Sequence, residues 1–160
     1  MNDITSIAWE VTQDMFWSSI AALGFSMLFN VPTRTLIGCV ACGAIGHGSR
    51  TLSIELGATI VSGSLIGAVI IGLLGYLFAK RWHAPATVFT ISGSIPLVPG
   101  RFAYSTMLSL IQLSTADSKT GESLLVQASI NGIQTMMILG VIAAGISAPT
   151  LFFERTRPTV

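Results

Sequence analysis

The residues best suited to chemistry lie close together in the stretch GHGSR at positions 46–50. His47 and Arg50 are three residues apart, so on a helix they share a face. Histidine is the side chain that titrates near neutral pH, and Arg50 adds a permanent positive charge. Together they could receive a carboxylate or relay a proton. The alternative is that they anchor a helix end at the membrane interface while the glycines allow close packing.

A second candidate is the stretch SIPLVPGR at positions 94–101. It lies in a run of about 33 residues, 84–116, which would measure roughly 50 Å as one helix and is too long for a straight crossing. Pro96 and Pro99 each remove a backbone donor and clash with the preceding turn. Gly100 can adopt conformations closed to other residues. We therefore predict a broken helix at Pro96/Pro99–Gly100, roughly 18 Å into the run and near the bilayer midplane.

Unwound backbone at that depth must lie inside protein or beside water. The half-helix that follows begins with free N–H groups and a positive dipole end, which suit an anion. A simple proline kink without a ligand is the alternative. Arg101 follows the break, and a cation within a span usually faces a cavity or a partner. Its side chain could equally reach the outer interface by snorkelling.

The remaining polar residues indicate structure more than catalysis. Cys39 and Cys42 have C-x-x-C spacing, but they lie in an apolar run without a second ligand pair, so we interpret them as packing residues and expect no metal or cofactor. Asp14 is interpreted as an interfacial N-cap or first-turn acid of the first span, in preference to a proton carrier. The chain lacks H-E-x-x-H, G-x-S-x-G and G-x-x-x-x-G-K motifs, so no catalytic residue is assigned.

The composition indicates a membrane protein. Only 9% of the 160 residues are Asp, Glu, Lys or Arg, against roughly a quarter in a soluble domain. A net charge of +1 argues against a nucleic-acid partner. Residues 1–14 contain three acidic side chains and no Lys or Arg. This differs from the basic start of a secretory signal, so we expect the first hydrophobic run to be retained.

The charge-poor runs predict an all-α membrane bundle of about five transmembrane helices in a single domain. A span requires about 20 mostly apolar residues. The predicted spans cover about residues 14–32, 35–54, 56–79, 84–114 and 124–152.

Loop charges predict the orientation, because Lys and Arg of short loops accumulate on the cytoplasmic side. Five spans with the N-terminus outside place five cations inside and two outside: Arg34, Lys80, Arg81, Arg155 and Arg157, against Arg50 and Lys119. We therefore predict a periplasmic N-terminus and a cytoplasmic C-terminus. A rival topology makes the fourth run a re-entrant hairpin, with four spans and both termini inside. The charge bias disfavours it.

Small residues recur at helical spacing in two spans. Gly63 and Gly67 form a small-xxx-small pair, and Gly140 and Ala144 repeat the pattern in the last span. Such residues let helix backbones approach closely. We predict packing seams at both places, against either this chain or another.

Several of these motifs, in this order, resemble one protein family. They are GFSMLFNVP at 24–32, GHGSR at 46–50, IPLVPG at 95–100 with Ala103–Tyr104, and Arg157–Pro158. The set is similar to the small subunit of the bacterial two-subunit members of the threonine/serine exporter family, over nearly the whole chain. Arg101 departs from the family pattern, and its role rests on the physical argument alone. The positions carried over as substrate path are His47, Arg50, Pro96, Pro99, Gly100 and Tyr104.

The resemblance implies an inner-membrane exporter subunit that works with a larger partner subunit. The implied substrates are small carboxylates, succinate first among them, or the amino acids threonine and serine. Five spans that start outside suit one half of an inverted-repeat transporter, with the partner supplying the other half. The alternative is a purely structural subunit that stabilises its partner.

Overall fold

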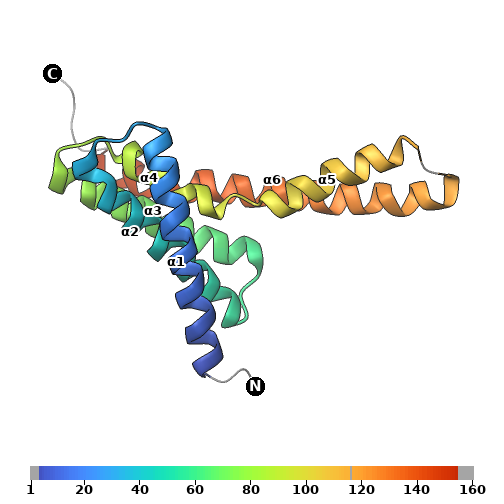
Figure 1. Ribbon diagram of the computed structural model, residues 1–160, viewed down its shortest axis with the longest axis horizontal. Helices are drawn as coiled ribbons and strands as arrows, with labels where there is room; N and C mark the ends of the chain where they lie inside the picture. The colour runs from blue at the N-terminus through green and yellow to red at the C-terminus, as the bar shows by residue number, and fades with distance from the viewer. Residues whose placement is uncertain (1–3, 116, 155–160) are drawn as a thin grey trace. The chain divides into compact units, whose positions relative to one another are not determined.

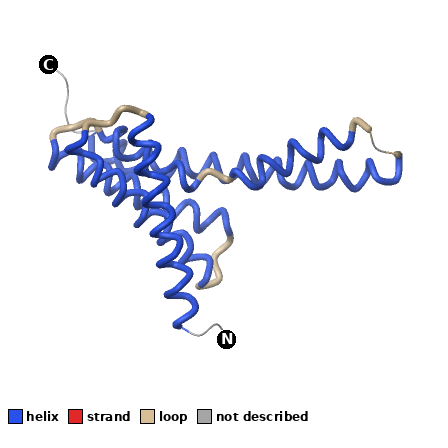
Figure 2. Tube along the Cα trace, viewed as in Figure 1, coloured by secondary structure: helices blue, strands red, loops and turns tan. Residues whose placement is uncertain are grey.

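The computed structural model describes residues 4–115 and 117–154, and every regular element in these ranges is helical (Figures 1 and 2). The all-α prediction is therefore confirmed. In chain order the elements are α1 (Ile4–Leu28), the 3-10 helix η1 (Thr33–Thr35), α2 (Leu36–Glu55), α3 (Ile60–Trp82), α4 (Ala86–Ser94), the 3-10 helix η2 (Ile95–Leu97), α5 (Gly100–Leu113) and α6 (Ser118–Glu154).

The chain divides into two compact units. Of the described residues, one unit contains those up to Leu97 together with those from Val141 onward, and the other contains those from Val98 to Gly140. The first therefore holds α1 to η2 and the last part of α6. The second is a helical hairpin of α5 and the first part of α6, in which Leu113 lies beside Gly121 and Thr106 beside Gly132.

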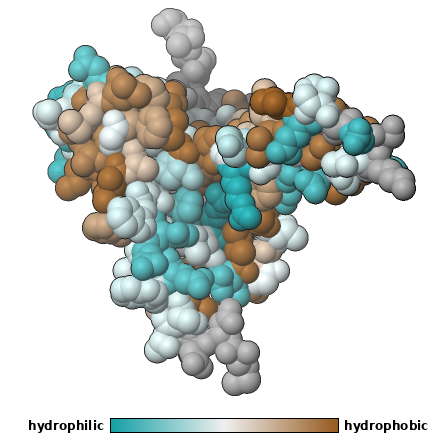
Figure 3. Space-filling view, turned by 45° about the vertical axis from the view of Figure 1, so that its right-hand side comes forward, coloured by the Kyte–Doolittle hydropathy of each residue, from teal (hydrophilic) through white to brown (hydrophobic). Residues whose placement is uncertain are grey.

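Large apolar side chains are exposed on every α-helix. Met136, for example, is 74% exposed and Phe152 is 80% exposed. In Figure 3 such residues, in brown, cover broad parts of the visible surface. A soluble monomer rarely exposes apolar surface on this scale, whereas a membrane protein turns it toward lipid. The fold is therefore that of a membrane protein.

Two helices in the described ranges are long and apolar enough to cross a bilayer: α3, and α6 over residues Thr120–Phe153. They correspond to the third and fifth predicted spans. The count of five spans and the orientation of the termini stay predictions. The orientation also depends on Arg155 and Arg157, which lie outside the described residues.

The interpretation of Asp14 as a helix N-cap is wrong. Helix α1 begins at Ile4, so Asp14 lies near its middle. The first run contains no proline or glycine before Gly24 to stop the helix. Apolar residues at helical spacing, Ile4, Ile7 and Val11, continue the pattern toward the N-terminus.

The expected interruption of the fourth run is present. Helix α4 ends at Ser94, Pro96 lies within the 3-10 turn η2, and Pro99 occupies the N-cap position of α5. Pro99 has no side-chain hydrogen bond to offer the new helix, and Gly100 begins it. Missing backbone donors at two positions only three residues apart prevent a continuous helix.

Helix α2 is the centre of the first unit and contacts α1, α3 and α4. Its buried residues are all glycine or cysteine: Gly38, Cys39, Cys42, Gly43, Gly46 and Gly48. A Cβ on Gly43 would lie 2.5 Å from the Ala22 Cβ of α1, so the two backbones already touch. Cys39 and Cys42 are free, buried thiols in this core, as their interpretation as packing residues predicts.

The two predicted packing seams, on α3 and on α6, differ in what they contact. Gly63 and Gly67 of α3 lie against α2, as described below. On α6 the residue that packs against α3 is Gly145, where a Cβ would lie 2.7 Å from the Ala68 Cβ. Ala144 is exposed, and no atom lies within 4 Å of a Cβ built on Gly140. Within the described chain the α6 seam therefore runs along Gly145, on the line next to the predicted one.

Candidate functional site

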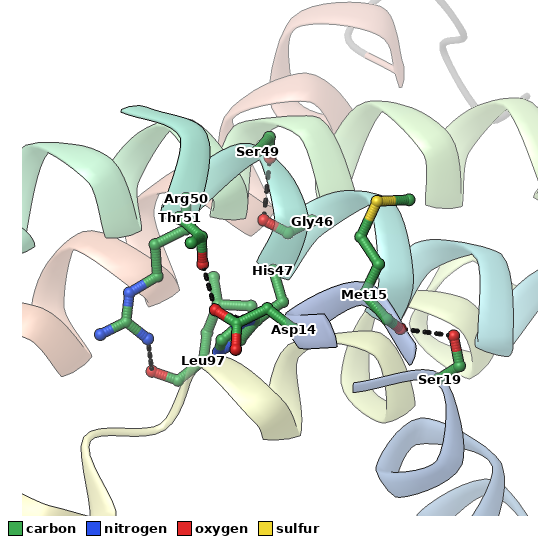
Figure 4. Close-up of polar contacts among 9 residues, drawn as sticks. All are labelled: Asp14, Met15, Ser19, Gly46, His47, Ser49, Arg50, Thr51 and Leu97. Atoms are coloured by element: carbon green, nitrogen blue, oxygen red, sulfur yellow. Dashed lines mark hydrogen bonds and ion pairs between the residues drawn. The ribbon is translucent and has the colours of Figure 1, made fainter. Parts of the chain in front are cut away.

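A polar cluster forms where α1, α2 and η2 meet (Figure 4). It contains Asp14 from α1 and His47, Arg50 and Thr51 from α2, with the backbone of η2 beside them. All of these residues belong to the first unit. His47 and Thr51 are four residues apart and therefore occupy one face of α2.

Gly48 lets α1 pack closely enough against α2 for this cluster to form. A Cβ on Gly48 would lie 2.4 Å from Cγ of Met15, so the methionine side chain occupies the space that any larger residue would need. Asp14 precedes Met15 in the sequence. The close α1–α2 contact at Met15 thus carries the Asp14 carboxylate to the His47 and Thr51 side of α2 (Figure 4).

The Asp14 carboxylate is the shared partner of the cluster. Its Oδ2 atom accepts a hydrogen bond from the Thr51 hydroxyl. The same oxygen lies 3.6 Å from Nδ1 of His47. The Asp14 side chain is 42% exposed and that of His47 is 19% exposed. The carboxylate therefore reaches solvent on one side and faces the imidazole on the other.

The His47 imidazole is held between α1 and η2. Its Nδ1 atom is buried and makes no hydrogen bond to the described residues, because the 3.6 Å separation from Asp14 exceeds hydrogen-bond length. The backbone carbonyl of Pro96 also interacts with the ring. Since Nδ1 is turned toward Asp14, the nitrogen left for this carbonyl is Nε2.

Arg50 points to the break in the fourth run. Its Nη1 atom donates a hydrogen bond to the Leu97 carbonyl at 3.4 Å. This carbonyl is available because Pro96 and Pro99 end regular helical bonding around it. Helix α3 packs against this part of the site at Gly67, which leaves room for the Arg50 Cβ and for the Leu97 side chain.

The charges of the cluster balance without any further ion. Asp14 contributes one negative charge, Arg50 one positive charge, and a neutral His47 none. An arginine offers five N–H donors in a fixed fork that matches a carboxylate. The cluster can thus bind a carboxylate at Arg50 and accept a proton at His47. Within residues 4–115 and 117–154, no three His, Cys, Asp or Glu side chains gather closely enough to hold a metal ion.

The structure brings three of the predicted path residues together: His47, Arg50 and Pro96. Pro99 is buried at the start of α5, whereas Gly100, Arg101 and Tyr104 are exposed on α5. These four belong to the second unit. Their role in a substrate path stays a prediction.

Sequence reasoning missed Asp14 and Thr51 as members of the site. The signal for Thr51 was its position four residues after His47. The signal for Asp14 was the apolar pattern that precedes it, which shows that the helix already contains this residue. A charge in the middle of a packed helix requires a partner, and a charge at a helix end does not.

The fold and the cluster together define the class of protein. Exposed apolar helices and charged side chains gathered between packed helices are typical of a membrane transport protein. The chain belongs to the threonine/serine exporter family: the family model described as "Threonine/Serine exporter, ThrE" matches residues 14–152. The match begins at Asp14 and includes the whole cluster. No solved structure matches the chain.

Proposed function

We propose that this chain is a subunit of a bacterial inner-membrane exporter of small carboxylates and that Arg50 receives the substrate carboxylate. The observation that carries the proposal is the setting of Arg50. Its hydrogen bond within the described chain goes to a backbone carbonyl at 3.4 Å, beside a broken helix. A guanidinium held by one long, neutral bond retains donors for a carboxylate, which binds more strongly because it is charged.

Two substrate types contain that carboxylate. A dicarboxylate such as succinate is the candidate that the sequence resemblance favours. The neighbouring charges of Asp14 and Arg50 also suit an amino acid, whose ammonium group would lie near Asp14 and whose carboxylate would lie near Arg50. The family description names threonine and serine. The shared chemistry is the carboxylate, and a transport assay separates the two types.

A larger partner subunit completes the proposed exporter. One argument is the inverted-repeat architecture of many transporters, in which two related halves enclose a site at the midplane. Five spans beginning outside would supply one such half. The small-residue side of α6, with Gly140 and the exposed Ala144, offers a surface for a second chain.

The test is purification of the tagged full chain from its own membranes in mild detergent, followed by reconstitution of the complex into vesicles. We expect a larger subunit of the same family to co-purify and labelled succinate, threonine or serine to cross the membrane. Transport of none of the three would contradict the proposal.

A purely structural role for this chain is separated from transport by two variants. His47→Ala and Pro99→Ala should reduce export in complexes present at the normal amount, because each alters the proposed path. Export at the normal rate in both variants would favour the structural role.

A further inference from the structure

Two atoms that can each bind a proton face each other in the Asp14–His47 contact. Oδ2 of Asp14 carries only lone pairs when ionised. Nδ1 of a neutral His47 also presents a lone pair when the ring proton is on Nε2, where the Pro96 carbonyl can accept it. These two acceptors face each other at 3.6 Å, and Nδ1 is buried without a hydrogen bond in the described structure. A buried polar atom without a partner is costly, and one proton placed between Nδ1 and Oδ2 would give both atoms a partner.

We propose that Asp14 and His47 together bind one proton, and that this proton is linked to the carboxylate bound at Arg50. The inference rests on the function proposed above. In the step itself, a proton from water adds to the Nδ1 lone pair of His47. The new N–H group then donates to Oδ2 of Asp14, and no other covalent bond forms or breaks. Thr51 continues to donate to the same carboxylate.

The surroundings of the imidazole act in opposite directions: burial and the Arg50 charge disfavour a proton there, whereas the Asp14 carboxylate and the Pro96 carbonyl favour it. The groups that act on the imidazole are Asp14 from α1, Arg50 from its own helix and the Pro96 carbonyl from η2. Helices α4 and η2 contain no titratable side chain. The titratable residues of α3 lie in its last two turns, from Tyr76 to Arg81. Helix α3 meets the site earlier, at Gly63 and Gly67. On α1, Glu10 lies one turn before Asp14 and is exposed.

The proton changes the net charge of the cluster, and this creates the linkage. Asp14, Arg50 and neutral His47 sum to zero, whereas the protonated cluster carries +1. A dicarboxylate therefore binds the protonated cluster more tightly, and by reciprocity its binding favours proton uptake. An amino acid behaves in the opposite way, because its ammonium group competes with the proton for Asp14. The sign of the linkage thus distinguishes the two substrate types.

The linkage can be measured on the purified complex in weakly buffered detergent solution with a pH-indicator dye. Succinate should cause uptake of about one proton per molecule bound, and its Kd should rise up to tenfold per pH unit on the alkaline side of the titration. Threonine should instead release a proton. A substrate that binds without any proton change would overturn the proposal.

Variants test whether Asp14 and His47 are the residues that bind the proton. His47→Gln should abolish the proton change and Asp14→Asn should move it to lower pH, whereas Glu10→Gln, which removes an exposed acid from the same helix, should leave it unchanged. Asp14→Glu keeps a carboxylate and should retain the linkage with a shifted midpoint. If Asp14→Asn fails to assemble, Asp14→Glu decides the question, and an unchanged midpoint would contradict the assignment.

A substrate-free measurement separates failure of this inference from failure of the proposed function. The chain has 2 histidines, so the exposed-loop variant His83→Gln leaves His47 as the one imidazole seen by nitrogen NMR of labelled protein. Nδ1 should be unprotonated at high pH and protonated at low pH. Asp14→Asn should lower its proton affinity at least threefold. An equal affinity in both proteins would overturn the pair even if transport is normal.

Discussion

Substitution of Gly67 by alanine should loosen the contact that supports Arg50. The new Cβ would lie 2.6 Å from the Gly46 carbonyl oxygen, 3.2 Å from Cδ2 of Leu97 and 3.3 Å from the Arg50 Cβ. Ordinary contact begins at 3.4 Å, so α3 must move away from α2 by 3.4 − 2.6 = 0.8 Å. Overpacking of this kind costs about 1–3 kcal/mol, and the better helix propensity of alanine offsets about 1 kcal/mol.

The net loss of up to about 2 kcal/mol corresponds to a fall in Tm of at most roughly 4–8 °C. It can be followed by thermal unfolding of the purified complex in detergent, together with transport, which should fall because Arg50 and Leu97 are displaced. Gly24→Ala is the matched control, since no atom lies within 4 Å of a Cβ at that position. Equal thermal stability of Gly67→Ala and Gly24→Ala would refute the reasoning.

Three further predictions follow from the same contacts. Gly145→Ala should lower the Tm by a similar amount, because its Cβ would meet the Ala68 Cβ at 2.7 Å, whereas Gly24→Ala, with no atom within 4 Å of its Cβ, should not lower it; equal Tm values would contradict the placement of the α6 seam. Thr51→Val removes a donor to Asp14 and should shift the pH dependence of transport while the complex still forms; an unchanged pH profile would show that the hydroxyl does not tune the carboxylate. Reporter fusions should place the N-terminus in the periplasm and the C-terminus in the cytoplasm, and two cytoplasmic termini would rule out the inverted-half topology.

The break in the fourth run could be predicted because its cause is local. Pro96 and Pro99 remove backbone donors whatever surrounds them, and Gly100 follows directly. The same holds for the end of α1, where Asn30 adopts a left-handed conformation with φ of 55° just before Pro32. Features set by the covalent chemistry of a few neighbouring residues are visible in the sequence.

The partners across helices could not be predicted in the same way. Gly140 and Ala144 lie on one line of α6 and Gly145 lies on the next, and the small residues on both lines look equally suited to packing. The choice depends on which face α3 covers. Likewise, the Asp14 carboxylate meets His47 only because Met15 fits over Gly48, a contact between residues more than thirty positions apart.

The spacing of His47 and Arg50 identified both residues as site candidates, but it did not predict which group each side chain would face. Three residues apart, they share a face in a general sense. In the structure, His47 turns toward Asp14 of α1 and Arg50 turns toward the Leu97 carbonyl of η2. The division of roles between proton and carboxylate comes from those two directions, which the packing of α1 and the break after α4 determine.

The central claim is that Arg50 binds the carboxylate of an exported substrate. Its most direct test is substrate exchange across vesicles that contain equal amounts of the wild-type complex or of the Arg50→Gln complex, with labelled succinate and threonine on one side. We predict exchange of at least one substrate by the wild type and a loss of tenfold or more in the variant, because a charge-assisted, bidentate contact is removed. Exchange at the wild-type rate by the Arg50→Gln complex would contradict the claim.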